Sequence, residues 1–215
     1  IDLKNNEEYH HARFPDFDSE VKFSTIIASH VFEHSLDPTK FLLKCKNLLE
    51  KNGSIFLSIP NFEIWINEKY WNGITPEHQI YPTIKQVKEI CNKLKLKLKY
   101  IKFENHSVFF KISDHLKNND VKTKDEDLKI NEWIDSINES VNYLEKELSK
   151  YDNSNIFITG ASHISQYPIL ISSKIKERIS FVLDNSKSKH QKRLYGTEIY
   201  CKPFEFIENL KKPST

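Results

Sequence analysis

The chain has 215 residues, a length that suits one large or two small domains and allows a sizeable hydrophobic core. Hydrophobic residues make up 38% and charged residues 29%, a composition that favours a globular protein over a disordered or fibrous one. The formal net charge is only +2, so the chain has no overall electrostatic attraction for nucleic acids. We therefore expect no nucleic-acid partner.

The sequence also contains indications of the protein's location in the cell. No apolar run approaches the roughly 18 residues of a membrane helix, and the first residues have no signal-peptide character. We expect a cytoplasmic protein without a membrane partner. Its three cysteines, Cys45, Cys91 and Cys201, are far apart and odd in number, which favours reduced core thiols over a disulfide framework.

The first predicted elements form a strand, a helix and a strand. The apolar run over residues 23–29 predicts a strand buried on both faces of a parallel sheet. Asp37 and Pro38 then begin a helix that we expect to end at Gly53, and residues 55–59 predict the next strand. This spacing is typical of a crossover in a parallel α/β sheet.

Further elements complete this first domain. Thr83 is expected to cap a second helix, and residues 96–103 and 107–112 predict a hairpin at the edge of the sheet. The polar, lysine-rich stretch 113–127 predicts a linker, and apolar residues at helical spacing over 130–148 predict a long amphipathic helix. We therefore place the domain boundary in the linker.

The last third begins a second α/β unit. Strands are predicted at residues 155–159 and 179–183, with a helix over 163–175 between them and a short third strand at 198–200. The predicted fold class is α/β, with two Rossmann-like units. The expected organisation is a first domain, a linker with its helix, and a C-terminal unit, over residues 1–112, 113–150 and 151–215.

The motif from His30 to His34 lies at the carboxyl end of the first predicted strand, where open α/β sheets place their ligands. Two histidines at i, i+4 can bind zinc on a helix, but no third ligand is near them in the sequence. We therefore expect no metal site. The alternative is that this motif is a polar loop that only caps the next helix and binds no ligand.

The residues around this motif resemble the second half of a class I SAM-dependent methyltransferase. The resemblance rests on an ordered series of short matches, at residues 26–34, 36–38, 41–42, 48–49, 53 and 59–61. It implies that the first strand and its loop lie beside the cofactor, S-adenosylmethionine. Ser29 and His30 are the cofactor-binding residues that it implies within the motif.

Two later segments narrow the resemblance to the sugar-nucleotide C-methyltransferases, which append a second Rossmann-like unit. One is the Glu77-His78 pair in the loop before the second helix, and the other is the last third of the chain. The implied substrate is a small molecule, a nucleotide-linked ketosugar. Methylation of a carbon beside a ketone requires a base that removes a proton, and histidine has the suitable pKa.

His78 is accordingly the expected base of the enzyme that the resemblance implies. Glu77 is expected to orient it or to hold a sugar hydroxyl, and His34 to donate to the developing enolate oxygen. The alternative for each of these residues is a polar position in a turn or at the start of a helix.

The family's glycine-rich cofactor loop is absent from this sequence, whose four glycines cannot form a Gly-x-Gly-x-x-Gly motif. Asp2 is the expected ribose ligand if a strand of the family precedes it. In the C-terminal unit, the amides at Gly160 and Ala161 and the ammonium groups of Lys187 and Lys189 are the candidates for binding the substrate's phosphates. The alternative is a tight turn without a ligand, with the lysines on a solvated surface.

Two other functions stay open at this point. One is a non-catalytic protein that binds a sugar nucleotide or a partner and derives from the methyltransferase fold. An O- or N-methyltransferase shares the motifs and needs no carbon base at position 78.

Overall fold

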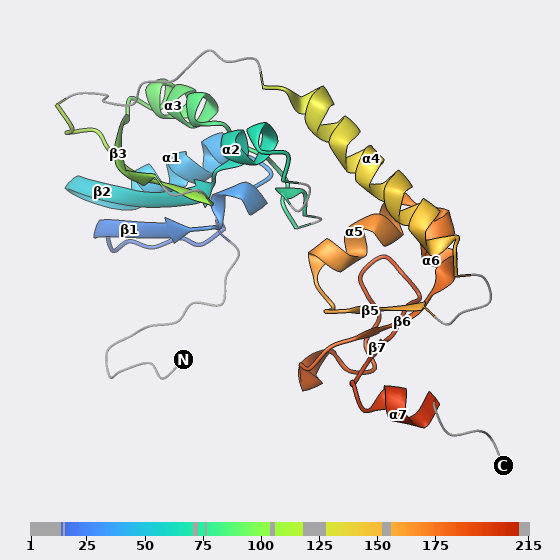
Figure 1. Ribbon diagram of the computed structural model, residues 1–215. Coiled ribbons are helices and arrows are strands. Elements are labelled where there is room, and N and C mark those ends of the chain that lie inside the picture. Colours follow the sequence, from blue (N-terminus) through green and yellow to red (C-terminus); the bar gives the residue numbers. More distant parts are fainter. Residues whose placement is uncertain are drawn as a thin grey trace. The chain divides into compact units, whose positions relative to one another are not determined.

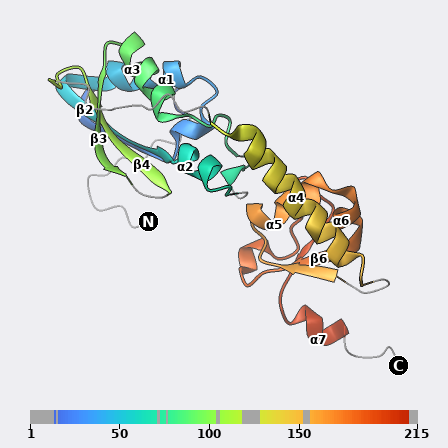
Figure 2. The ribbon, with the colours of Figure 1, turned by 45° about the horizontal axis from the view of Figure 1, so that its top comes forward.

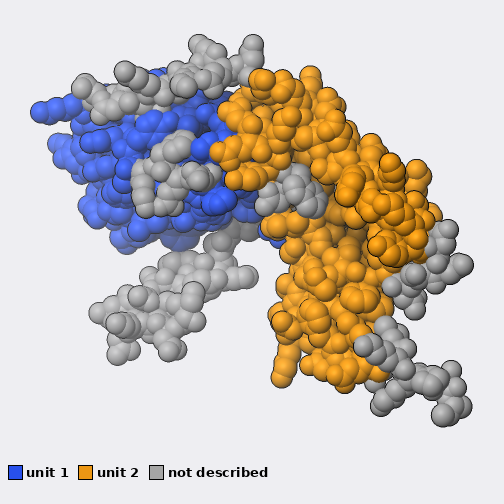
Figure 3. Space-filling model, viewed as in Figure 1, with its two compact units in different colours: residues 1–65, 77–127 blue, residues 66–76, 128–215 orange. Residues whose placement is uncertain are grey.

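The computed structural model describes residues 14, 16–70, 73–75, 77–103, 106–117, 128–151 and 156–210. The chain forms two compact units, one of residues 1–65 and 77–127 and the other of residues 66–76 and 128–215 (Figure 3). The segment 66–76 thus belongs with the C-terminal unit, although it precedes the stretch where the sequence indicates a boundary.

The first unit is built on a mixed four-stranded sheet in the order β1-β2-β4-β3 (Figures 1 and 2). Strands β1 and β2 are parallel, whereas β4 is antiparallel to both β2 and β3. The elements are β1 (Phe23–Ser29), the 3-10 helix η1 (Phe32–His34), α1 (Pro38–Leu48), β2 (Leu49–Pro60), α2 (Phe62–Asn67), α3 (Ile84–Lys93), β3 (Lys97–Phe103) and β4 (Ser107–Ser113). The expected crossover and edge hairpin are both present.

Helices α1 and α3 pack on one face of this sheet and form its core. Phe41 and Leu42 of α1 and Val87 of α3 are buried against Leu57 of β2 and Phe110 of β4. In β1, Ala28 joins this core, but Ile27 on the other face is 76% exposed. The expectation that β1 is buried on both faces is wrong, because both helices cover the same face and successive side chains of a strand alternate.

Helix α1 begins as the sequence predicts but ends earlier. The Asp37 carboxylate accepts a hydrogen bond from the amide of Lys40 at 2.9 Å, and Pro38 is the first helical residue. The helix ends at Leu48, not at Gly53, and β2 starts at the next residue. A Cβ at Gly53 would lie 3.1 Å from the backbone oxygen of Phe23, so this glycine permits close approach to β1 instead of ending a helix.

The second unit contains a parallel three-stranded sheet in the order β5-β6-β7. Its elements are α4 (Ile130–Leu148), β5 (Ile156–Thr159), α5 (His163–Ile171), α6 (Ser173–Arg178), β6 (Ile179–Leu183), the 3-10 helix η3 (Lys187–Lys189), β7 (Cys201–Lys202) and α7 (Phe206–Leu210). A small core forms where α4, α5 and α6 meet the sheet, and its buried residues from these elements are Val141, Ile169, Ile175, Ile179 and Val182.

Two expectations for the second unit are wrong in detail. The single helix predicted over 163–175 is two helices, because Ser172 is extended and its hydroxyl caps α6 by accepting from the amide of Ile175 at 3.1 Å. The third strand is Cys201–Lys202 and not residues 198–200, of which Tyr200 forms only an isolated bridge to Arg193.

Helix α4 is amphipathic, as its sequence predicts. Its buried residues, Trp133, Ile137 and Val141, recur every fourth position and form one stripe, and most of the other residues of the helix are polar. Within the described part of the chain, no helix combines the length and the apolar character that crossing a membrane requires.

Candidate functional site

The loop of residues 77–80 lies directly on the 3-10 helix η1 at the carboxyl end of β1. The backbone oxygen of Glu33 accepts hydrogen bonds from the amides of Gln79 at 2.9 Å and Ile80 at 3.1 Å. The Nδ1 atom of His34 lies 2.8 Å from the backbone oxygen of Glu77. The fold therefore brings together the three residues that the sequence singles out as catalytic candidates, His34, Glu77 and His78.

His78 is the most enclosed of the three candidates. Its side chain is 11% exposed, and its ring lies 5.1 Å from that of His34 and 5.6 Å from that of Tyr81, between centroids. Burial lowers the pKa of His78 below its ordinary value, an effect that the nearby Glu33 carboxylate partly offsets. The neutral imidazole is favoured in consequence, and it has a lone pair that can accept a proton.

Glu33, which lies near His78, is 1% exposed. Neither of its carboxylate oxygens has a hydrogen-bond partner among the described residues, and the same is true of Nδ1 of His78. Two histidine nitrogens approach Oε1 of Glu33, with Nδ1 of His30 at 3.2 Å and Nε2 of His78 at 4.0 Å. Sequence reasoning gave Glu33 no role, because its burial depends on a loop that is distant in the sequence.

The same cluster brings together three side chains that could act as metal ligands. Glu33, His34 and His78 each offer one ligand atom, and these atoms lie within 4.8 Å of one another. The cluster includes His34 but not His30, so it is not the pair of histidines that the sequence motif presents, and the expectation of no metal site stays a prediction. Histidine and glutamate are both ligands in known zinc sites.

The cofactor residues implied by the resemblance lie at the end of β1. The hydroxyl of Ser29 is 3.0 Å from that of Ser58 on β2, and Nε2 of His30 is 3.0 Å from the hydroxyl of Ser107 on β4. His30 has a φ of 50°, a left-handed conformation that a residue with a side chain seldom adopts. Asp2, the expected ribose ligand, lies outside the described residues.

The expected phosphate site of the second unit already holds a negative charge. Gly160 has a φ of 87° and turns the chain, but the amide of Ala161 donates to the carboxylate of Asp184 at 2.8 Å. The Lys189 ammonium donates to the same carboxylate at 2.9 Å. These bonds and the amide of Ser186 lower the pKa of Asp184 to about 2. Lys187 is exposed at the start of η3.

A phosphate at Ala161 would therefore meet a like charge. Sequence reasoning assigned no role to Asp184, although an acidic residue directly after a strand is a signal that could have indicated one. Gly160, Ala161, Lys187 and Lys189 belong to one unit, and His34, Glu77 and His78 belong to the other.

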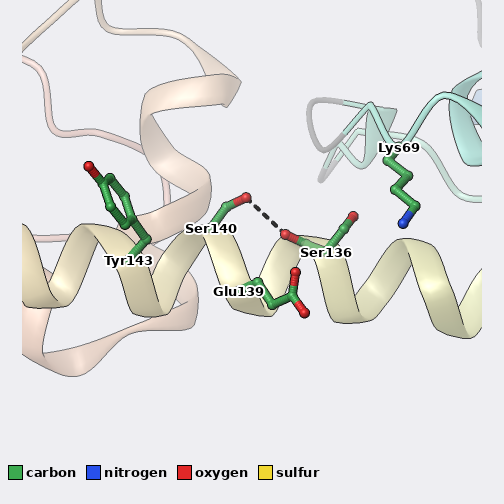
Figure 4. Close-up of a pocket in the computed structure, with 5 residues that line it drawn as sticks. All are labelled: Lys69, Ser136, Glu139, Ser140 and Tyr143. Carbon is green, nitrogen blue, oxygen red and sulfur yellow. Dashed lines mark hydrogen bonds between the residues drawn. The ribbon is translucent and has the colours of Figure 1, made fainter.

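A separate open hollow of about 540 Å³ lies along α4 in the second unit (Figure 4). It is lined by Lys69, Ser136, Glu139, Ser140 and Tyr143. The Ser140 hydroxyl donates to the backbone oxygen of Ser136 at 2.8 Å, an ordinary contact within a helix. The hollow contains none of the residues that the sequence singles out.

A scan of protein-family models and a search of curated proteins find no match to this chain.

Proposed function

We propose that this chain carries the acceptor-activating part of a SAM-dependent methyltransferase, in a Rossmann-like fold, and that it acts on a nucleotide-linked ketosugar. The observation that carries the proposal is the enclosure of His78 beside His34 at the carboxyl end of β1. A partly buried histidine with a lowered pKa, next to a second histidine, is a candidate general base. The position agrees with the place where open α/β sheets bind ligands.

In this proposal, His78 removes the proton from the carbon beside the ketone. The broken C–H bond leaves its electron pair on the acceptor as an enolate, and the proton moves to a nitrogen of His78. Because burial lowers the pKa of His78, the ring is neutral before the reaction at neutral pH. The ring is thus in the form that the reaction requires.

His34 has a more restricted role than the sequence suggests. The carbonyl oxygen of Glu77 only accepts hydrogen bonds, so Nδ1 of His34 must carry the proton of that contact. In the neutral ring, Nε2 then has a lone pair and no hydrogen. His34 therefore donates to an enolate oxygen from Nε2 only in its doubly protonated form.

S-adenosylmethionine supplies the methyl group when it is bound, and the residues of this chain do not make up a complete cradle for it. The chain has four glycines, Gly53, Gly73, Gly160 and Gly196, and none belongs to a glycine-rich loop. This observation favours a second candidate function, that of a non-catalytic protein that binds a sugar nucleotide. A methyltransferase with an oxygen or nitrogen acceptor would use the same fold without His78 as a base.

Calorimetric titration separates these functions. The purified chain is titrated with S-adenosylmethionine and then with a panel of nucleotide sugars, and methyl transfer is followed in the mixture. Binding of S-adenosylmethionine at micromolar Kd together with turnover supports the enzyme. Binding of a nucleotide sugar without S-adenosylmethionine binding supports the non-catalytic protein. The absence of binding to either ligand would overturn both proposals for this chain.

A further inference from the structure

In the described part of the chain, the carboxylate of Glu33 is buried without hydrogen bonds that would compensate its charge. Its side chain is 1% exposed, and both carboxylate oxygens are buried without a hydrogen-bond partner among the described residues. Burying a carboxylate is costly unless a cation or a hydrogen-bond donor compensates its charge. The position therefore requires a partner that becomes positively charged or that arrives with a ligand.

Two histidines approach one oxygen of this carboxylate. Nδ1 of His30 is 3.2 Å from Oε1 of Glu33, and Nε2 of His78 is 4.0 Å from the same atom. The side chain of His30 is 44% exposed, whereas that of His78 is 11% exposed. Oε1 is thus near both an enclosed imidazole and one that is exposed to solvent.

We propose that Glu33 is the positioning residue of His78, the carboxylate that stabilises the protonated imidazole and connects it to solvent through His30. This inference rests on the proposed role of His78 as a base. The proton taken from the acceptor binds Nε2 of His78, and the positive ring is drawn toward Oε1. The proton then passes through Oε1 to Nδ1 of His30 and from there to water, which returns His78 to its neutral form.

The sequence suggests Glu77 for this orienting role, and the geometry favours Glu33. Glu77 contributes its backbone oxygen to His34, whereas Glu33 has a buried carboxylate oxygen facing His78. Of the two carboxylates, Glu33 has the larger influence on the pKa of His78. Among the described residues, the other charged or titratable groups near His78 are His30, His34 and Tyr81.

An NMR titration of the whole chain with labelled histidines tests this proposal without S-adenosylmethionine or acceptor. The His78 signal is assigned from its loss in His78→Asn, and pKa values are measured in a buffer with a metal chelator. Removal of the charge in Glu33→Gln should lower the pKa of His78, because the protonated ring loses its counter-ion. Glu77→Gln is the matched control and should lower it less, while Glu33→Asp, which keeps the charge, should restore much of the wild-type value.

Three outcomes would overturn the proposal. In the first, the pKa of His78 is the same in wild type and in Glu33→Gln. In the second, Glu77→Gln lowers it more than Glu33→Gln does. In the third, stoichiometric Zn²⁺ binds the wild-type chain at the His34 and His78 signals but does not bind Glu33→Gln, which would make the cluster a metal site. Failure to bind S-adenosylmethionine would refute the proposed function. It would not change what the NMR titration shows about the effect of Glu33 on the pKa of His78.

Discussion

His34 and Glu77, 43 positions apart in the sequence, are joined by a hydrogen bond from Nδ1 of the imidazole to the backbone oxygen, at 2.8 Å. The contact fixes the tautomer of His34 and also holds the start of the loop that carries His78. Two further bonds, from the amides of Gln79 and Ile80 to the backbone oxygen of Glu33, hold the same loop. The position of the candidate base thus depends on η1.

The first prediction concerns the order of this loop. In wild type, we expect the amides of Gln79 and Ile80 to exchange slowly with solvent because both donate to the backbone oxygen of Glu33. His34→Ala removes one of the three contacts and should speed exchange at both amides, while exchange in the core of α3 stays unchanged. Hydrogen exchange followed by NMR measures this. Unchanged exchange in the variant would contradict the role of His34 in holding the loop.

The second prediction concerns catalysis. His78→Ala should reduce methyl transfer about 10²-fold or more, the usual contribution of a general base, and should leave the affinity for S-adenosylmethionine nearly unchanged. His115→Ala, a histidine of the same unit next to Ser113, is the control and should retain activity. Initial rates and calorimetry give the two readouts. Full activity of His78→Ala would exclude the carbon-base role.

The starts of the helices could be predicted from sequence because capping is local. Asp37 and Thr83 accept hydrogen bonds from amides three residues later, a pattern visible in any single sequence. The end of α1 could not be predicted in this way. Gly53 resembles a helix terminator, but its role is set by the Phe23 backbone, which lies beside it only in the folded sheet.

The candidate site, too, could be predicted from the sequence only in part. Its location at the carboxyl end of β1 follows from the strand pattern, and the Glu77-His78 pair is visible in the sequence. The burial of Glu33 and the occupation of the Ala161 amide by Asp184 are products of tertiary structure. A linear motif cannot show which of its polar groups already have a partner.

A third prediction tests local stability at α3. The Thr83 hydroxyl accepts from the amide of Gln86 at 3.2 Å, and the Gln86 side chain accepts from the amide of Thr83 at 2.9 Å. Thr83→Ala should reduce the free energy of unfolding of the first unit by about 1 kcal/mol, whereas Thr83→Ser, which keeps the hydroxyl, should cost much less. Urea denaturation provides the comparison. Equal losses in the two variants would show that the hydroxyl is not the stabilising group.

A fourth prediction concerns the thiols. Burial raises the pKa of Cys45 and of Cys91 to about 12, and it also raises that of Cys201. Because the thiolate is the reactive form, none of the three should react quickly with an aromatic disulfide reagent at pH 8 until the chain is unfolded. Ser140→Cys, at an exposed position of α4, is the positive control. Rapid modification of the native wild-type chain would contradict the buried placement of these residues.

The last prediction concerns the acid stability of the second unit. In the folded chain the pKa of Asp184 is about 2, because its carboxylate accepts from the amides of Ser186 and Ala161 and from Lys189. In the unfolded chain the pKa returns to its ordinary value near 4. The stabilising contribution of Asp184 is therefore fully present above about pH 4 and is lost as the pH falls toward 2.

Asp184→Asn isolates this contribution. The free energy of unfolding of wild type should exceed that of the variant by a constant amount above about pH 4, and the difference should shrink steadily between about pH 4 and pH 2. Urea titrations at several pH values, followed by a probe in the second unit, measure it. A difference that stays the same at every pH would mean that Asp184 stabilises the turn after β5 through its shape and not through its charge. The same variant should bind inorganic phosphate more tightly than wild type if Ala161 and Lys189 form a phosphate site, because the competing carboxylate is gone.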